Sequence, residues 1–459
     1  MRKAMLIAAV AVVAAAGAIV GVIVSSGGGG SAAPASTSSS SSSGSTSSTS
    51  ATASTGSSGG TSGTHPNATG TTSTTGPPAP LIPTTTAAIP PPPSPRSPRR
   101  GSFTVGTVDD SLAQPNPASA RAQVNLSHRA GFDAIDISAL WQPGRVAPTA
   151  GTLRGIRNAA AAAHRDGMRL FLVAWHGLAG GTPQGGAERQ QFATFTAALV
   201  KAVPSTAGVI VDNEPNLNTF WLPQFGPGGS DVAAAAYEDL LARTYDAVKA
   251  ASPSTRVIGV ALSPRGADRP HGIRPTHSPA AFILDLGRDY RASERRRPLM
   301  DAFAIHPYML SSRIPPTRAH PGTKQITMAD YPRLVTLLDE AFRGTGQRGR
   351  TLPILYTEFG VQTVVPRTKL AAYQPGTTPD AEDAVSAATQ AAYYREALAL
   401  AYCQPTVRGL FVFHTFDEPR LDGWQSGLYY ADRTPKPSLK GFRQAVADLR
   451  DGKLTTCGR

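Results

Sequence analysis

The stretch "GVIVDNEPN" at Gly208–Asn216 runs from an apolar segment straight into a turn that carries a carboxylate. A short, near-continuous apolar run predicts a strand that is buried on both faces, as in a parallel sheet. A buried strand seldom ends on an acid that faces the protein interior. Glu214 is therefore the first candidate for a functional side chain.

Apolar runs of the same kind recur along the chain, and alanine-rich stretches typical of helices separate them. Two of these stretches stop at Gly131 and Gly167, and a glycine just past a helix end is the usual stop residue. Together with the first run, the pattern predicts a closed (β/α)8 TIM barrel of the α/β class. The alternative is a doubly wound open sheet, which usually has a glycine-rich turn after its first strand, and "VGTVDDS" has none. The other runs are "FTVGTV" at 103–108, "FDAIDI" at 132–137, "RLFLVAW" at 169–175, "RVIGVAL" at 256–262, "DAFAIH" at 301–306, "PILYTE" at 353–358 and "GLFVFHTF" at 409–416.

Polar and aromatic residues follow nearly every one of these predicted strands. In a (β/α)8 barrel the strand ends meet at one mouth, where active sites lie. Glu214 is the first acid after the fourth predicted strand, and Glu358 is the first acid after the seventh. These two strands face one another across the mouth. Cleavage of a glycosidic bond needs two such carboxylates, at roughly 5–5.5 Å for retention of configuration and farther apart for inversion.

The pair "VDNEPN" and "ILYTEFG" resembles the clan A retaining glycosidases, the cellulase-like (β/α)8 enzymes. "LVAWHG" is similar to the clan's third strand, which ends in His-Gly, and "AIHPY" is similar to its His-x-Tyr after strand six. "GLYYADRTPKPSLKGF" resembles the tail after strand eight. The resemblance covers nearly all of 102–450 and implies that Glu214 is the general acid/base and Glu358 the nucleophile.

The same resemblance implies roles for residues beside the two glutamates. Asn213 would hydrogen-bond the sugar 2-hydroxyl, and Tyr308 would hold Glu358 in its ionised form. His176 and His306 would line the sugar site, although each could equally be a satisfied core histidine at a strand end.

Four further strand-end and loop residues are candidates for contact with the sugar. Trp175 and Trp141 follow the third and second strands, and residues of this type more often pack in the core than form sugar platforms. His414 and Trp424, on the last strand and in the loop after it, complete the expected substrate-binding set.

Two positions depart from the pattern of the clan. Many members carry an arginine on strand two that supports the nucleophile, whereas "AIDIS" has Asp136 there. Many also place a tryptophan at the end of strand eight, where "FVFHTF" offers Phe413. These differences put the identity of the sugar in doubt more than the class of reaction.

Three other functions are compatible with parts of the pattern. A non-hydrolytic carbohydrate-binding barrel on the cell surface would share the aromatic residues but would not need both glutamates. A transglycosylase acting on envelope glycan would use the same pair. A metal-dependent barrel hydrolase would want His-x-His after the first strand, which "TVDDS" lacks. We therefore expect a hydrolase with no cofactor and no metal, acting on an oligo- or polysaccharide.

The first hundred residues differ in composition from the rest. Residues 1–24 begin with the positively charged Arg2 and Lys3 and continue as a long uncharged apolar run. This pattern predicts a signal peptide or an uncleaved membrane anchor. Residues 25–101 are rich in Ser, Thr, Gly and Pro and predict a disordered linker. The catalytic domain would occupy 102–459 and lie outside the cytoplasm, secreted or anchored.

The remaining features concern partners and cysteines. A net charge of +13 without a basic helix or a nucleic-acid module predicts no nucleic-acid partner, and we expect a monomer. In an exported chain, Cys403 and Cys457 are expected to form a disulfide. Two cysteines without a Cys/His cluster make a structural zinc site unlikely from the sequence.

Overall fold

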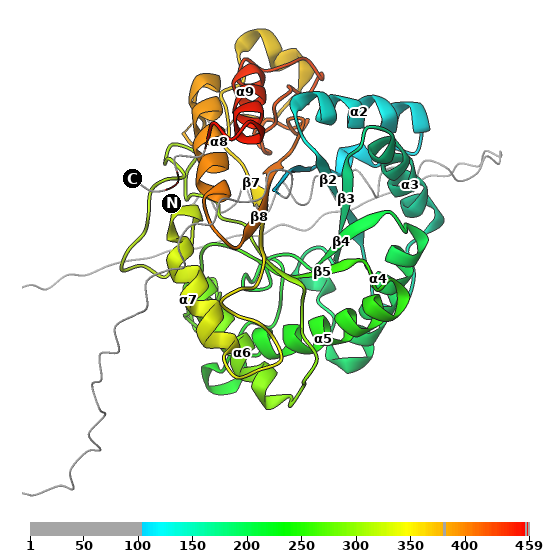
Figure 1. Cartoon of the computed structure of the whole chain (residues 1–459), viewed down its shortest axis with the longest axis vertical. Coiled ribbons are helices and arrows are strands. Elements are labelled where there is room, and N and C mark those ends of the chain that lie inside the picture. Colours follow the sequence, from blue (N-terminus) through cyan, green and yellow to red (C-terminus); the bar gives the residue numbers. More distant parts are fainter. Residues whose placement is uncertain (1–102, 380–381, 455–456, 458–459) are drawn as a thin grey trace, which may run out of the picture. The chain divides into compact units, whose positions relative to one another are not determined.

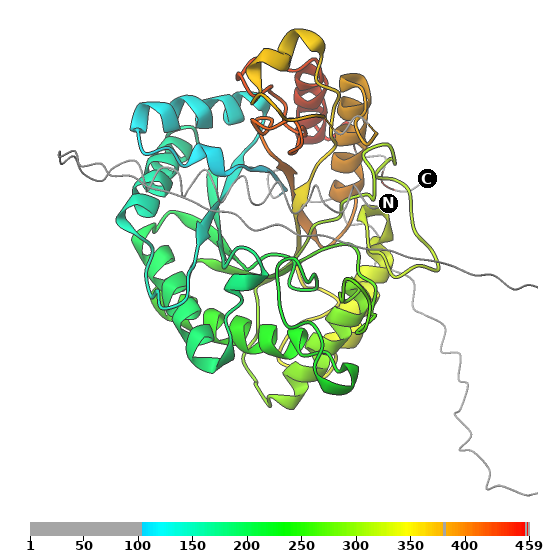
Figure 2. The ribbon, with the colours of Figure 1, turned by 180° about the vertical axis from the view of Figure 1, so that it is seen from behind.

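The computed structural model describes residues 103–459 except 380–381, 455–456 and 458–459. In this range eight parallel strands pair in chain order and close into a barrel. Figures 1 and 2 show the helices as a ring around these strands from either side. The predicted (β/α)8 barrel is confirmed, and the open-sheet alternative is wrong.

The strands and helices alternate along the whole described chain. The strands are β1 (Thr104–Val108), β2 (Ala134–Leu140), β3 (Arg169–Trp175), β4 (Thr206–Val211), β5 (Arg256–Leu262), β6 (Ala302–Ile305), β7 (Ile354–Phe359) and β8 (Val407–Phe413). The α-helices are α2 (Pro117–Ala130), α3 (Ala150–Arg165), α4 (Gly185–Ala202), α5 (Ala233–Ala251), α6 (Pro279–Ala292), α7 (Tyr331–Phe342), α8 (Ala387–Tyr402) and α9 (Ser438–Arg450). Short 3-10 helices lie at η1 (Asp110–Leu112), η2 (Ala179–Gly181), η3 (Pro227–Gly229), η4 (Met328–Asp330) and η5 (Arg367–Ala372).

The predictions for residues 1–24 and 25–101 lie outside the described residues. Among the residues that the structure describes, no helix has both the length and the apolar character needed to cross a membrane.

The barrel interior is filled by side chains and is not a pore. Phe171 of β3 and Phe411 of β8 meet edge to face, with ring centroids 5.1 Å apart. A side chain at Gly106 would lie 2.3 Å from the Phe411 ring, and one at Gly208 would press on Phe171 and on Ile258 of β5. Large rings opposite glycines therefore pack the barrel floor, and only the mouth is left open for a site.

Two helices end at the predicted glycines, and a side-chain cap begins one of them. The Asn116 side chain accepts hydrogen bonds from Ala118 N and Ser119 N at the start of α2. Gly131 ends that helix with a φ of 110°, a left-handed conformation that favours glycine. Gly167, just past α3, has a φ of 69° and confirms the second predicted stop.

The barrel wall between β4 and β5 is closed in part by a side chain. The Tyr237 hydroxyl of α5 donates to Val211 O and accepts from Val260 N, both at 2.7 Å. Val260 has a φ of 85°, rare for a β-branched residue, and the pairing of β5 with β6 shifts register there. The hydroxyl replaces a ladder hydrogen bond where the strand bends, so the end of β5 turns toward the β4 terminus.

The loop after β8 is held by a buried ion pair. Lys436 Nζ lies 2.6 Å from Asp417 Oδ1, and both side chains are almost fully buried. The Tyr373 hydroxyl donates to the other oxygen of Asp417 at 2.7 Å, and Lys436 also donates to Gln425 O at 2.8 Å. A buried pair is stable only with such added hydrogen bonds, which here fix the segment that carries Trp424.

The predicted disulfide is confirmed. Cys403, just past α8, is bonded to Cys457 in the C-terminal tail. The bridge ties the tail to the helix that precedes the last strand.

Replacing both cysteines by alanine should lower the free energy of unfolding by about 4 kcal/mol, because the bridge closes a loop with a sequence separation of 54. Chemical denaturation of the variant and the oxidised parent measures the difference. Peptide mapping without reductant confirms that the parent is bridged. Equal midpoints for a bridged parent and the variant would contradict the expectation.

Candidate active site

Glu214 stands on a left-handed turn just past β4. Asp212 and Glu214 have φ values of 65° and 43°, which cost non-glycine residues roughly 1–2 kcal/mol each. Glu214 N donates to Ala261 O of β5 at 3.0 Å, and Leu217 N donates to Glu214 O at 2.9 Å. Strained backbone held this firmly is typical of functional sites, and here it presents the Glu214 carboxylate to the cavity at the barrel mouth.

Glu358, near the end of β7, faces Glu214 across this cavity. His306 Nδ1 lies 3.2 Å from Glu214 Oε1 and 3.5 Å from Glu358 Oε2. These two oxygens are therefore at most about 7 Å apart, a bound that admits the roughly 5–5.5 Å of a retaining pair and excludes most of the roughly 6.5–9.5 Å range of an inverting pair. Tyr308 donates its hydroxyl hydrogen to Glu358 Oε2 at 3.0 Å.

The charges of the pair and the imidazole depend on one another. Burial raises the pKa of Glu358 above its ordinary value, although His306, the Tyr308 hydroxyl and His414 all oppose this. Burial also disfavours the charged form of His306, but Glu358 and Glu214 outweigh it and raise the pKa of the imidazole. A protonated His306 can therefore bridge two carboxylates that would otherwise repel each other.

Two aspartates bring further carboxyl groups to the mouth. Asp110 Oδ1 accepts a hydrogen bond from Ser138 N at 2.6 Å. Asp136 is 1% exposed, and neither of its carboxylate oxygens has a hydrogen-bond donor within the described part of the chain. Burial, then Asp110 and Glu358, raises the pKa of Asp136 well above its usual range. At the position where the resemblance predicts an arginine, this chain buries a carboxyl group that interacts electrostatically with Glu358.

Aromatic rings form one wall of the cavity. The Trp424 ring centroid lies 5.2 Å from that of Tyr308 and 5.5 Å from that of Phe413. Trp424, predicted as a substrate-binding residue, comes from the loop after β8 and packs beside Phe413 at the end of that strand. Trp175 and Phe220 also line the cavity. Flat faces of the kind that a sugar ring packs on are therefore present from two strands and three loops.

The structure brings together most of the residues predicted from the sequence. Asn213, Glu214, Trp175, His306, Tyr308, Glu358, His414 and Trp424 all line this cavity. His414 Nε2 is 3.2 Å from Glu418 Oε1, another lining carboxylate.

Two predicted sugar contacts lie elsewhere. Trp141 is 1% exposed, packs edge to face on Phe192 of α4 and donates to Arg145 O at 2.8 Å, so it belongs to the core between barrel and helices. His176 is buried with its Nε2 3.1 Å from Asp212 Oδ2. Neither residue lines the cavity. His176 instead lies against the strained turn that carries Glu214.

Some lining residues were not selected from the sequence. Arg265 and Glu418 follow predicted strands but carry no motif of their own, and Phe220 lies in a loop. Asp383, at the end of the segment 367–383, accepts from Ser312 N at 2.9 Å and so joins the loops after β6 and β7 at the cavity edge. These residues can be recognised as part of the site only from the structure, where their loops lie together at the cavity.

The fold and the site together define a (β/α)8 barrel with paired carboxylates at its mouth. No protein-family model matches the sequence. No curated protein matches it either.

Solved structures share the fold at low sequence identity. The GH53 catalytic domain of Ignisphaera aggregans is 18% identical, with a TM-score of 0.51 over 75% of this chain and 96% of that one. GH5_18 from Streptomyces cattleya, in complex with GlcNAc, is 18% identical with a TM-score of 0.49, covering 78% and 81%. A β-glucosidase from Thermotoga maritima is 12% identical with a TM-score of 0.49, covering 76% and 98%. The likeness to the Ignisphaera domain supports the barrel fold.

Replacing Asp136 with asparagine should stabilise the protein more at pH 7 than at pH 4. The folded-state pKa of Asp136 lies above the unfolded one, so the folded state keeps its proton more tightly and loses stability as pH rises between the two values. Asparagine cannot ionise and removes that loss. Thermal unfolding across this pH range measures the difference between variant and parent, at roughly 2 °C of Tm per kcal/mol.

The control is Glu340→Gln on the exposed surface of α7, which shows the effect of losing a carboxylate far from the cavity. A difference between Asp136→Asn and the parent that does not grow with pH would mean that Asp136 carries no burial penalty.

Proposed function

We propose that this chain is a retaining O-glycosidase that acts on an oligo- or polysaccharide outside the cytoplasm. The observation that carries the proposal is the contact of one imidazole nitrogen, His306 Nδ1, with both Glu214 and Glu358. It brings two carboxylates together at the mouth of a (β/α)8 barrel at a spacing that favours double displacement. The extracytoplasmic location rests on the apolar segment at 1–24.

The reaction follows from two carboxyl groups in opposite protonation states. The ionised Glu358 attacks the anomeric carbon while the protonated Glu214 gives its proton to the departing oxygen, which leaves a glycosyl ester on Glu358. Glu214 then takes a proton from water. The resulting hydroxide attacks the same carbon and releases Glu358, so the configuration is restored.

Neighbouring residues support the ionised nucleophile and the binding of the sugar. The Tyr308 hydroxyl bonds Glu358 Oε2 and favours the ionised nucleophile against the opposing effect of burial. Asn213, beside the acid, would hold a sugar hydroxyl. Trp424 and Phe413 offer apolar faces for the sugar ring.

The two catalytic roles predict different failures. Glu358→Ala should abolish turnover of every substrate of the parent, and added azide should restore it by forming the glycosyl azide of inverted configuration. Glu214→Ala should lose most activity on poor leaving groups and least on nitrophenyl glycosides, because an acidic phenol leaves without protonation. Azide should rescue this variant with retained configuration.

A panel of nitrophenyl glycosides and polysaccharides first identifies a substrate of the parent, and NMR of the products then gives the configuration. Glu340→Ala serves as the surface control and should retain parental rates. Product analysis with added sugar acceptors distinguishes hydrolysis from transglycosylation, which uses the same pair. Parental activity in both catalytic variants would exclude the assignment.

Tyr308→Phe should shift the acid limb of the pH profile of kcat/KM to higher pH. Loss of the hydroxyl removes a hydrogen bond to the ionised form, so the pKa of Glu358 rises further and a higher pH is needed to ionise it. A hydrogen bond to a charged group contributes about 1.5–3 kcal/mol, so activity at the optimum should fall roughly 10- to 100-fold.

The matched control is Tyr393→Phe, which removes a hydroxyl that bonds Arg313 O outside the cavity. It should leave both the acid limb and the rate unchanged. An acid limb that moves to lower pH in Tyr308→Phe would show that Tyr308 does not support the nucleophile.

A further inference from the structure

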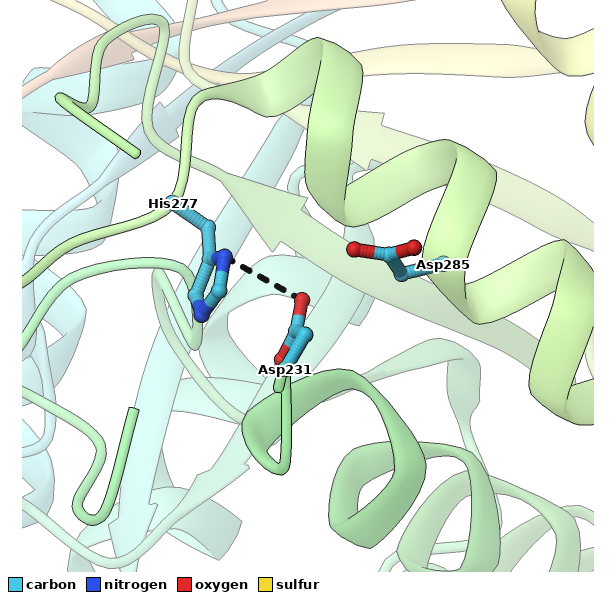
Figure 3. A group of neighbouring side chains, drawn as sticks. All are labelled: Asp231, His277 and Asp285. Carbon is cyan, nitrogen blue, oxygen red and sulfur yellow. Dashed lines mark ion pairs between the residues drawn. The ribbon is translucent and has the colours of Figure 1, made fainter. Parts of the chain in front are cut away.

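A second polar cluster lies beside the barrel, apart from the carboxylate pair. It contains Asp231, just before α5, His277, just before α6, and Asp285, in the middle of α6 (Figure 3). One ligand atom from each of the three side chains lies within 4.8 Å of the other two. None of the three lines the cavity at the barrel mouth.

The orientation of the His277 ring is fixed by its surroundings. Nε2 lies 2.9 Å from Gln224 O, and because a carbonyl only accepts hydrogen bonds, Nε2 carries the hydrogen. The Phe225 ring packs on the imidazole with centroids 4.0 Å apart. With the hydrogen on Nε2, the neutral ring has its lone pair on Nδ1. An N–H held by a backbone carbonyl is the usual support of a metal-binding histidine.

That lone pair faces carboxylate oxygens. Asp231 Oδ2 is 3.2 Å from His277 Nδ1, the Asp231 side chain is 4% exposed, and Oδ2 has no hydrogen-bond donor among the described residues. The other oxygen of Asp231 accepts from Ala234 N at 2.9 Å. Asp285 offers a further carboxylate oxygen within 4.8 Å of the ligand atoms of Asp231 and His277. Two acids and a nitrogen lone pair thus meet in a buried place, which is costly without a positive charge between them.

We propose that Asp231, His277 Nδ1 and Asp285 bind a divalent transition-metal ion of the zinc type. An imidazole nitrogen with two carboxylates suits zinc, whereas calcium prefers oxygen ligands alone. Arg288 contacts Oδ1 of Asp285, which leaves Oδ2 for the metal. The Asp285 side chain is 22% exposed, so the ion can enter from solvent and water can complete its coordination.

The position of the site gives the ion a structural role. His277 N donates to Asn216 O at 2.9 Å, and Asn216 Nδ2 donates back to His277 O at 3.1 Å. Asn216 follows Glu214 by two positions in "NEPN". Asp231 belongs to the same loop after β4, while His277 and Asp285 follow β5. The ion would join these two loops and hold the turn that carries Glu214, as a positioning element without contact to substrate.

The test uses the full chain, stripped with a chelator and then titrated with zinc chloride. Elemental analysis after gel filtration should find one zinc per chain, and saturating zinc should raise Tm by roughly 5 °C. Asp231→Asn and His277→Gln should each lose this zinc and its Tm increase. Without metal, Asp231→Asn should be at least as stable as the stripped parent because it relieves repulsion, and this shows that the variant folds.

The matched control is Asp330→Asn, which breaks the contact of Asp330 with His320 at 3.3 Å, a similar pair without a third ligand. This variant should bind one zinc per chain like the parent. Failure of the parent to bind zinc, equal binding by Asp231→Asn, or stabilisation by calcium and not by zinc would each overturn the proposal. All these readouts are independent of glycosidase activity, so they stand or fall apart from the proposed function.

Discussion

Repulsion among carboxylates in one apolar barrel mouth is the constraint on which the rest of the site depends. Asp110, Asp136, Glu214 and Glu358 all line one cavity, and burial makes each negative charge costly there. His306 lies between the two glutamates and can neutralise part of that charge. His306 contacts both glutamates, so its charge and the ionisation of Glu358 depend on each other. Both also depend on the spacing of the two glutamates.

Much of the fold could be predicted because parallel strands buried on both faces leave continuous apolar runs in the sequence. The runs at 169–175 and 256–262 coincide with β3 and β5, and the others are displaced by a few residues. The displacements arise where strands bend. At β4 the run extends through Asp212, but the left-handed turn there ends the strand at Val211. Apolar composition does not encode such a turn.

The two glutamates could be predicted because each directly follows its strand, and strand ends converge in a barrel. The prediction for Trp141 failed because a position after β2 does not determine the direction of the side chain. The indole could point to the mouth or to α4, and in the structure it packs on Phe192 of α4. Trp424 reaches the mouth only through the loop fixed by Lys436 and Asp417. The cluster of Asp231 and His277 follows no motif, because two loops after different strands must meet to form it.

The Tyr237 hydroxyl that spans Val211 and Val260 has a consequence for how such barrels diverge. Losing the hydroxyl alone would leave a backbone carbonyl and an amide without partners inside the wall. A relative that lacks this hydroxyl on the helix after its fourth strand must satisfy the two groups with a water or another side chain, or pair the ends of β4 and β5 directly, which straightens β5. The carbonyl of Ala261, which holds Glu214, would then move with it. A change on the outer helix layer can thus alter the position of the acid in the mouth, although the helix does not touch the cavity there.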